Sequence, residues 1–196
     1  MNSKQNECVK TEKTASVKKY SVIVLLAFYV VSLIRFLILK DLMGISVSVF
    51  SIFATISLII LNRKKERLLE DKLFIALIWY ICIASVLGSG YGFYDINHYD
   101  DFLHVASGLL SSTAAISILK YFNDEESVSK INKVFIIIYV FMFSMGVASL
   151  WEIGEFSMDN ILHTNTQVGG LTDTVMDMID AMVGSIATII CIRKKI

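Results

Sequence analysis

The chain has 196 residues, of which 55% are hydrophobic and 18% are charged, with a formal net charge of zero and no proline. A soluble domain of this length carries more charge and more turn residues, so the composition excludes an ordinary soluble protein. Because proline breaks or kinks helices, its absence favours long unbroken helices. The composition therefore indicates a protein that lies in a membrane.

Six apolar runs follow one another along the chain. A run of about 18 apolar residues or more predicts a transmembrane helix, because about 20 residues at a rise of 1.5 Å cross the hydrocarbon core. The runs cover residues 21–39, 44–61, 73–89, 102–119, 134–156 and 173–192. The sequence therefore predicts an all-α, polytopic integral membrane protein, with one bundle of six transmembrane helices in residues 20–192.

The basic residues lie between these runs in an alternating pattern. Lysine and arginine gather in residues 1–19, between the second and third runs, between the fourth and fifth, and in residues 193–196. Only Arg35 and Lys40 lie at the opposite ends of the runs. Because cytoplasmic loops carry the excess of basic residues, both termini are predicted to lie in the cytoplasm. Residues 1–19 are expected to form a flexible basic tail beside anionic lipid headgroups, and residues 193–196 a short basic C terminus.

The fourth run begins with the stretch "NHYDDFLHVASG", residues 97–108, which brings titratable groups against a lipid-compatible helix. Asp100, His104 and Gly108 recur every four residues, so they share one helix face. On the fifth run, Glu152 and Glu155 are three residues apart and also share a face. They are expected near the end of that helix, where the helix dipole disfavours acids.

The sixth run carries Asp173, Asp177 and Asp180, at spacings of four and three residues. The face of Asp177 continues inward through Ala181 and Gly184, and such small residues let a neighbouring helix approach closely. Ionised carboxylates in a membrane are costly, and several side by side also repel one another. These acids are therefore expected to meet at the outer ends of the last three helices.

A bound divalent metal ion would stabilise this collection of acids. Histidine together with carboxylates is a suitable ligand set for zinc, manganese or iron. The six candidate metal ligands are Asp100, His104, Glu152, Glu155, Asp173 and Asp177.

Simpler interpretations compete with the metal site. Asp100 or Asp101 caps the fourth helix, and Thr172 or Asp173 caps the sixth, because acids and hydroxyls bind the free N–H groups of a first turn. His98 and His163 are ordinary solvated loop histidines under this interpretation. The remaining groups then form a structural hydrogen-bond network that joins three helices.

These segments resemble the YjdF-like family of bacterial inner-membrane proteins. Residues 97–108 are similar to its N-H-Y-D-x-x-x-H-x-x-x-G element, and "WEIGEF", residues 151–156, to its E-x-x-E motif followed by an aromatic residue. Residues 173–184, "DTVMDMIDAMVG", are similar to its D-x-x-x-D-M-x-x-A-x-x-G element. A weaker likeness runs to the VanZ-like proteins, in which asparagine often stands at the place of Ala181.

The resemblance implies about six helices and a place in the bacterial cytoplasmic membrane. It favours the six candidate ligands over Asp101 and Asp180, which its motifs do not match. It implies no particular reaction.

Three functions fit these features. In the first, an enzyme holds a divalent metal that activates water or a phosphoryl group of a lipid-linked or other small-molecule substrate at the outer leaflet, and His104, Glu155 and Asp177 are the catalytic candidates. The second is a cation or proton transporter, although the inner halves of the last three runs carry no matching acids. The third is a structural or accessory membrane protein. No nucleic-acid partner is expected.

Overall fold

The computed structural model describes residues 2–65, 68–162, 166–167 and 170–193. Every regular element in these ranges is a helix, and six helical segments are long and apolar enough to cross a membrane. The prediction of an all-α protein with six spans is therefore confirmed. Where the sequence predicts one domain, the chain folds as two compact units, Met1–Ile96 and Asn97–Ile196, each with three of these spans.

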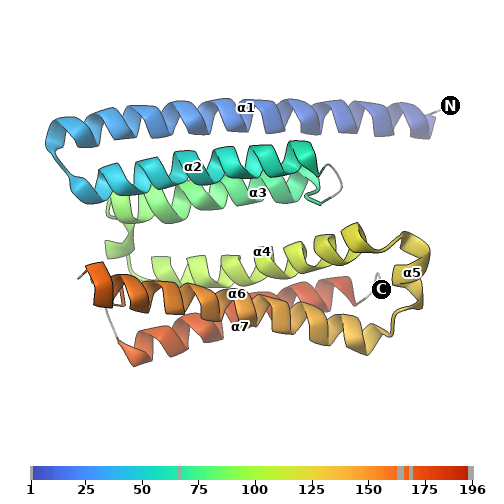
Figure 1. Cartoon of the computed structure of the whole chain (residues 1–196). Helices are drawn as coiled ribbons and strands as arrows, with labels where there is room; N and C mark the ends of the chain where they lie inside the picture. Colours follow the sequence, from blue (N-terminus) through green and yellow to red (C-terminus); the bar gives the residue numbers. More distant parts are fainter. Residues whose placement is uncertain (1, 66–67, 163–165, 168–169, 194–196) are drawn as a thin grey trace. The chain divides into compact units, whose positions relative to one another are not determined.

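The first unit consists of three long helical segments and one short turn of helix (Figure 1). The third segment changes from α-helix to π-helix part-way, and the Tyr91 N–H bonds the Val86 carbonyl five residues earlier at 2.9 Å. The elements are α1 (Asn2–Leu39), α2 (Leu42–Lys64), α3 (Asp71–Ile81), the π-helical η1 (Cys82–Gly90) and the 3₁₀ turn η2 (Phe93–Asp95).

The basic lead of the chain is part of α1. Helix α1 begins at Asn2 and extends past the ends of α2 and α3, so the segment expected as a flexible tail has helical backbone (Figure 1). Lys18 Nζ lies 2.6 Å from Asp71 Oδ1, which ties the basic end of α1 to the start of α3. These ends therefore lie on the same side of the unit, as the alternating charge pattern requires.

Aliphatic and aromatic side chains fill the interior of the first unit. Tyr29, Phe36 and Phe74 are almost fully buried, and the Tyr29 hydroxyl donates to the Ile78 carbonyl oxygen at 3.3 Å. Large apolar side chains also cover the outward faces of the helices, where lipid replaces water.

The second unit holds the candidate site. It contains α4 (Tyr99–Phe122), the short α5 (Glu125–Lys130), α6 (Lys133–Leu162) and α7 (Leu171–Ile192), and the three long helices each pack against the other two (Figure 1). Asp124 caps α5 by accepting the Ser127 N–H at 2.7 Å. Since consecutive long helices run in opposite directions, α4 and α7 begin at the end of the unit where α6 finishes.

Glycines bring α4 and α7 into backbone contact. A Cβ atom at Gly108 would collide with the Ala181 carbonyl, and one at Gly184 would collide with the Val105 carbonyl. This close approach confirms the prediction made from the small residues of α7. It also brings the helix faces that carry His104 and Asp177 together, because these residues lie about one turn before Gly108 and Ala181.

Buried hydroxyls continue the contact toward the other end of the unit. Ser112 Oγ donates to Ser185 Oγ at 3.0 Å, and Ser111 Oγ lies 2.7 Å from Ser144 Oγ. All four serines are buried and each bonds to another helix, so they hold α4 against both α6 and α7.

Candidate metal centre

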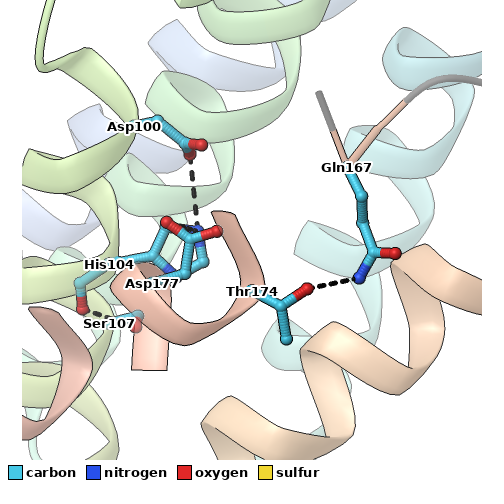
Figure 2. Close-up of polar contacts among 6 residues, drawn as sticks. All are labelled: Asp100, His104, Ser107, Gln167, Thr174 and Asp177. Carbon is cyan, nitrogen blue, oxygen red and sulfur yellow. Dashed lines mark hydrogen bonds and ion pairs between the residues drawn. The ribbon is translucent and has the colours of Figure 1, made fainter. Parts of the chain in front are cut away.

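Two groups of three potential ligands occupy the end of the second unit where α4 and α7 begin. The first consists of Asp100, His104 and Asp177, whose ligand atoms all lie within 4.8 Å of one another. Figure 2 shows these three side chains pointing toward one another from α4 and α7. His104 and Asp177 lie five and six residues inside their helices, about 8 and 9 Å along the axis at 1.5 Å per residue.

The distances in this group match ligands that surround an ion. His104 Nε2 lies 3.4 Å from Asp100 Oδ1 and 3.7 Å from Asp177 Oδ1. A charge-assisted N–H···O bond measures about 2.7–2.9 Å. Two ligand atoms that each lie about 2.1 Å from one ion, at the tetrahedral angle, are about 3.4 Å apart.

A second histidine–aspartate pair on the same helix end provides the contrast. His98 Nδ1 lies 2.7 Å from Asp101 Oδ2, which is a direct hydrogen bond between two exposed side chains. The buried His104 therefore stands at a longer distance from its two acids than the exposed His98 does from its single partner.

The second group consists of Glu152, Glu155 and Asp177, again with ligand atoms within 4.8 Å of one another. Glu152 is only 5% exposed, and neither of its carboxylate oxygens has a hydrogen-bond partner among the residues that the structure describes. Thr174 and Gln167 act on the Glu152 carboxylate without a direct hydrogen bond to it, and Gln167 Nε2 donates to Thr174 Oγ1 at 2.8 Å (Figure 2). A buried carboxylate without a partner is costly, and a cation would satisfy it.

The distribution of charge in the second unit also favours a bound cation at the cluster. Among its described residues, His104 is the one basic side chain with an electrostatic interaction with Glu152, Glu155 and Asp177. The described lysines and arginine of this unit belong to the last turn of α4, to α5, to the start of α6 and to the residue after α7, at the opposite end. The cluster therefore contains more acids than its own bases can neutralise.

Capping does not account for these acids. The N-cap residue of α4 is His98, in a left-handed conformation, and that of α7 is Gly170; neither helix has a side-chain cap. Asp100, Asp101, Thr172 and Asp173 all lie inside their helices, so the predicted caps are wrong. The acids of the first turn still benefit from the helix dipole.

Glu152 and Glu155 lie farther from the end of their helix than the sequence predicts. Helix α6 continues to Leu162, six residues beyond the predicted end of the fifth run. Because the dipole effect falls off within the last turn, the position of these two glutamates is not electrostatically unfavourable on that ground. Their significance comes from burial and from their neighbours.

The other acids lie outside the two groups. Asp173 interacts electrostatically with Glu152 and Asp177 but offers no ligand atom to either group. Asp101 forms a hydrogen bond with His98, and Asp180 belongs to neither group. His163 lies outside the described residues. The structure thus brings together five of the six candidate ligands, all except Asp173.

Sequence reasoning missed the residues that organise the connection between α6 and α7. Asp159 accepts hydrogen bonds from the Thr166 N–H and hydroxyl, both at 2.8 Å, and from the Gln167 N–H at 3.0 Å. Gln167 in turn reaches Thr174, three residues before Asp177. The helical spacing of Thr174 and Asp177 was the available signal.

Comparison with known proteins gives a family and no function. Residues 20–194 match the family model described as "Predicted membrane protein (DUF2238)". The chain belongs to this family. It is the family of the YjdF-like proteins, so that resemblance is confirmed, whereas the likeness to VanZ-like proteins gains no support. No curated protein and no solved structure matches the chain.

Proposed function

We propose that this membrane protein is a metal-dependent hydrolase of the bacterial cytoplasmic membrane. In this proposal both termini lie in the cytoplasm and the cluster faces the outer surface, as the distribution of basic residues favours. The substrate is a lipid-linked or other envelope molecule that enters from the outer leaflet. The observation that carries the proposal is the buried carboxylate of Glu152, without a hydrogen-bond partner in the described structure, beside Glu155 and Asp177.

A metal ion explains both the burial and the spacing of these side chains. It would neutralise carboxylates that have no lysine or arginine near them in the described part of their unit, and it fits the distances of 3.4 and 3.7 Å from His104 to its two acids. Structural metal sites commonly hold four ligands, whereas catalytic ones keep a position open for water or substrate. Three protein ligands in each group leave such a position.

The chemistry follows from a water bound at the open position. A metal lowers the pKa of bound water, so that hydroxide forms near neutral pH. With a metal bound, hydrolysis would join the water oxygen to the phosphorus or carbonyl carbon of the substrate and break the bond to the leaving oxygen. Glu155, which is partly exposed, would take the water proton and pass it to the leaving oxygen. His104 and Asp177 orient the reacting groups.

A phosphate-bearing substrate would depend on the metal ions at this site. Phosphate binding normally uses arginine or lysine, and the described part of the second unit has neither near the cluster. Metal ions would supply the positive charge in their place.

The first experiment is elemental analysis of the protein purified in detergent. The wild type is expected to retain a divalent metal, and His104→Ala and Glu152→Gln are each expected to retain less of it. Asp101→Asn is the matched control, because this acid lies in the first turn of α4 and pairs with His98 instead of the cluster. A metal-free wild type with normal stability, or equal metal loss in the control, would contradict the proposal.

Transport is the second candidate function, and the buried hydroxyls of Ser111, Ser112, Ser144 and Ser185 favour it. They extend polar groups from the cluster toward the other end of the unit. Their bonds to one another, at 2.7 and 3.0 Å, leave helices locked together rather than a hydrated path. Cation uptake into proteoliposomes tests transport: flux above that of empty vesicles supports it, and no flux above empty vesicles counts against it. A purely structural role predicts neither metal retention nor flux.

A further inference from the structure

We infer that the cluster is a dinuclear centre: it binds two divalent cations, and the carboxylate of Asp177 bridges them. This inference rests on the proposed function and deepens it, because it fixes the number of ions and the ligands of each. Asp100 and His104 hold the first ion, and Glu152 and Glu155 hold the second.

The sharing of Asp177 is the first observation. It is the one residue that belongs to both ligand groups in the described structure, and it is only 3% exposed. A carboxylate has two oxygens with several acceptor sites, so one residue can serve two ions at once. Its partners come from different helices, with Asp100 and His104 on α4 and the two glutamates on α6. Asp177 therefore lies between two sets of ligands.

The second observation is independent of the clustering. Glu152 is 5% exposed, yet neither of its carboxylate oxygens has a partner among the described residues. An ion held by Asp100, His104 and Asp177 alone would leave it unsatisfied, because Glu152 shares no ligand group with Asp100 or His104. A second ion beside the first gives Glu152 its partner.

Charge balance among the proposed ligands favours the same number. Asp100, Glu152, Glu155 and Asp177 carry four negative charges when ionised, and His104 binds metal as a neutral ring. Two divalent cations neutralise four carboxylates, whereas one leaves two charges uncompensated. In lipid surroundings, where uncompensated charge is costly, the neutral assembly is the stable one.

The ligand chemistry distinguishes the two positions. The first set contains an imidazole, which suits zinc, iron or manganese, and the second contains carboxylates only, which suit manganese or magnesium. Manganese fits both and is visible by electron paramagnetic resonance. Ions about 3.5–4 Å apart are also the arrangement that holds the attacking and leaving oxygens of a phosphoryl transfer.

The test loads the full-length protein with Mn²⁺ in detergent, removes free ions, and measures both the metal-to-protein ratio and the paramagnetic resonance spectrum. The expected result is two Mn²⁺ per chain with the multiline spectrum of a magnetically coupled pair. His104→Ala and Glu155→Gln are each expected to lower the ratio to one and abolish the coupling. Asp177→Asn is expected to abolish the coupling and lower binding at both positions. Asp180→Asn, on the same helix but in neither group, keeps two coupled ions.

The outcomes separate this inference from the proposed function. One Mn²⁺ per wild-type chain, or two without coupling, overturns the bridged pair and leaves a metal-dependent hydrolase standing. No bound Mn²⁺ overturns both. Because the wild-type protein alone distinguishes these cases, a variant that fails to fold does not change which of them holds.

Discussion

The two units contain the same number of membrane spans but are filled differently. The first unit buries aromatic and aliphatic side chains such as Tyr29, Phe36 and Phe74, and its buried polar residues are all neutral in the described structure. The second buries His104, Glu152 and Asp177. Lipid imposes the same cost on both, and the described part of the first unit shows that three spans pack without a buried carboxylate or histidine. The ionisable groups of the second unit are therefore best explained by a function.

The helix contacts differ in the same way. Large rings fill the space between helices of the first unit, whereas in the second unit Gly108 and Gly184 let two backbones touch. Backbone contact fixes the distance between α4 and α7 more rigidly than flexible side chains do. Such rigidity suits a site whose ligand atoms must converge on ions.

The largest effect is expected from filling the contact between α4 and α7. Gly108→Ala places a methyl group against the Ala181 carbonyl, and because backbone cannot rotate away as a side chain can, α4 must shift. We expect a loss of about 3 kcal/mol in the free energy of unfolding, together with loss of bound metal. Thermal unfolding in detergent and elemental analysis measure the two effects.

Gly146→Ala is the matched control for this variant. It lies on α6 with nothing within 4 Å of the added methyl, so stability is expected to stay equal or rise slightly. Equal losses in both variants would contradict the close backbone contact at Gly108, because Gly146 has open space around it and alanine has the higher helix propensity.

Removal of metal is the next largest effect. A ligand at a hundredfold excess over its dissociation constant stabilises the folded state by about 2.7 kcal/mol. A chelator is therefore expected to destabilise the wild type by a similar amount and to destabilise Glu152→Gln, which lacks a ligand of the second group, by less. Acidification should act like the chelator, because protons compete with metal for carboxylates and histidine. Thermal unfolding with and without chelator measures this. Identical shifts of the unfolding temperature in both proteins would contradict metal binding by Glu152.

A smaller effect is expected in the first unit. Tyr29→Phe removes the hydroxyl that donates to the Ile78 carbonyl, which costs about 1 kcal/mol. Metal content should not change, because Tyr29 belongs to the unit without ligands. Unfolding and elemental analysis of the same sample check both statements, and metal loss in this variant would show that the first unit supports the site.

The smallest effect concerns an acid outside the membrane spans. The Ser127 hydroxyl and N–H donate to Asp124 and hold the pKa of that carboxyl below its ordinary value. The cap therefore stabilises α5 at pH values above the ordinary Asp pKa, and this contribution is lost as pH falls through the lowered pKa. Hydrogen exchange of the α5 amides measures it. The expected result is a protection factor, the intrinsic exchange rate at each pH relative to the measured rate, that falls at low pH in the wild type but not in Asp124→Ala; the same pH dependence in both would rule out the cap.

Much of the site was predictable because helical periodicity is local. The spacing of Asp100 and His104, and of Glu152 and Glu155, places each pair on one face, whatever the rest of the chain does. Helix ends were less predictable, since an apolar run ends before its helix does: α6 continues through polar residues to Leu162.

By itself, the sequence determined six membrane spans, the helix faces that carry the acids and the small residues beside them, because these depend on hydropathy and on 3.6-residue periodicity. The tertiary structure decided that the spans divide into two units, that Asp177 belongs to both ligand groups while Asp173 belongs to neither, and that Glu152 is buried without a hydrogen-bond partner in the described part of the chain. These features depend on how far one helix is shifted along another. That shift is set by backbone contact at Gly108 and Gly184, and no spacing within a single helix encodes it.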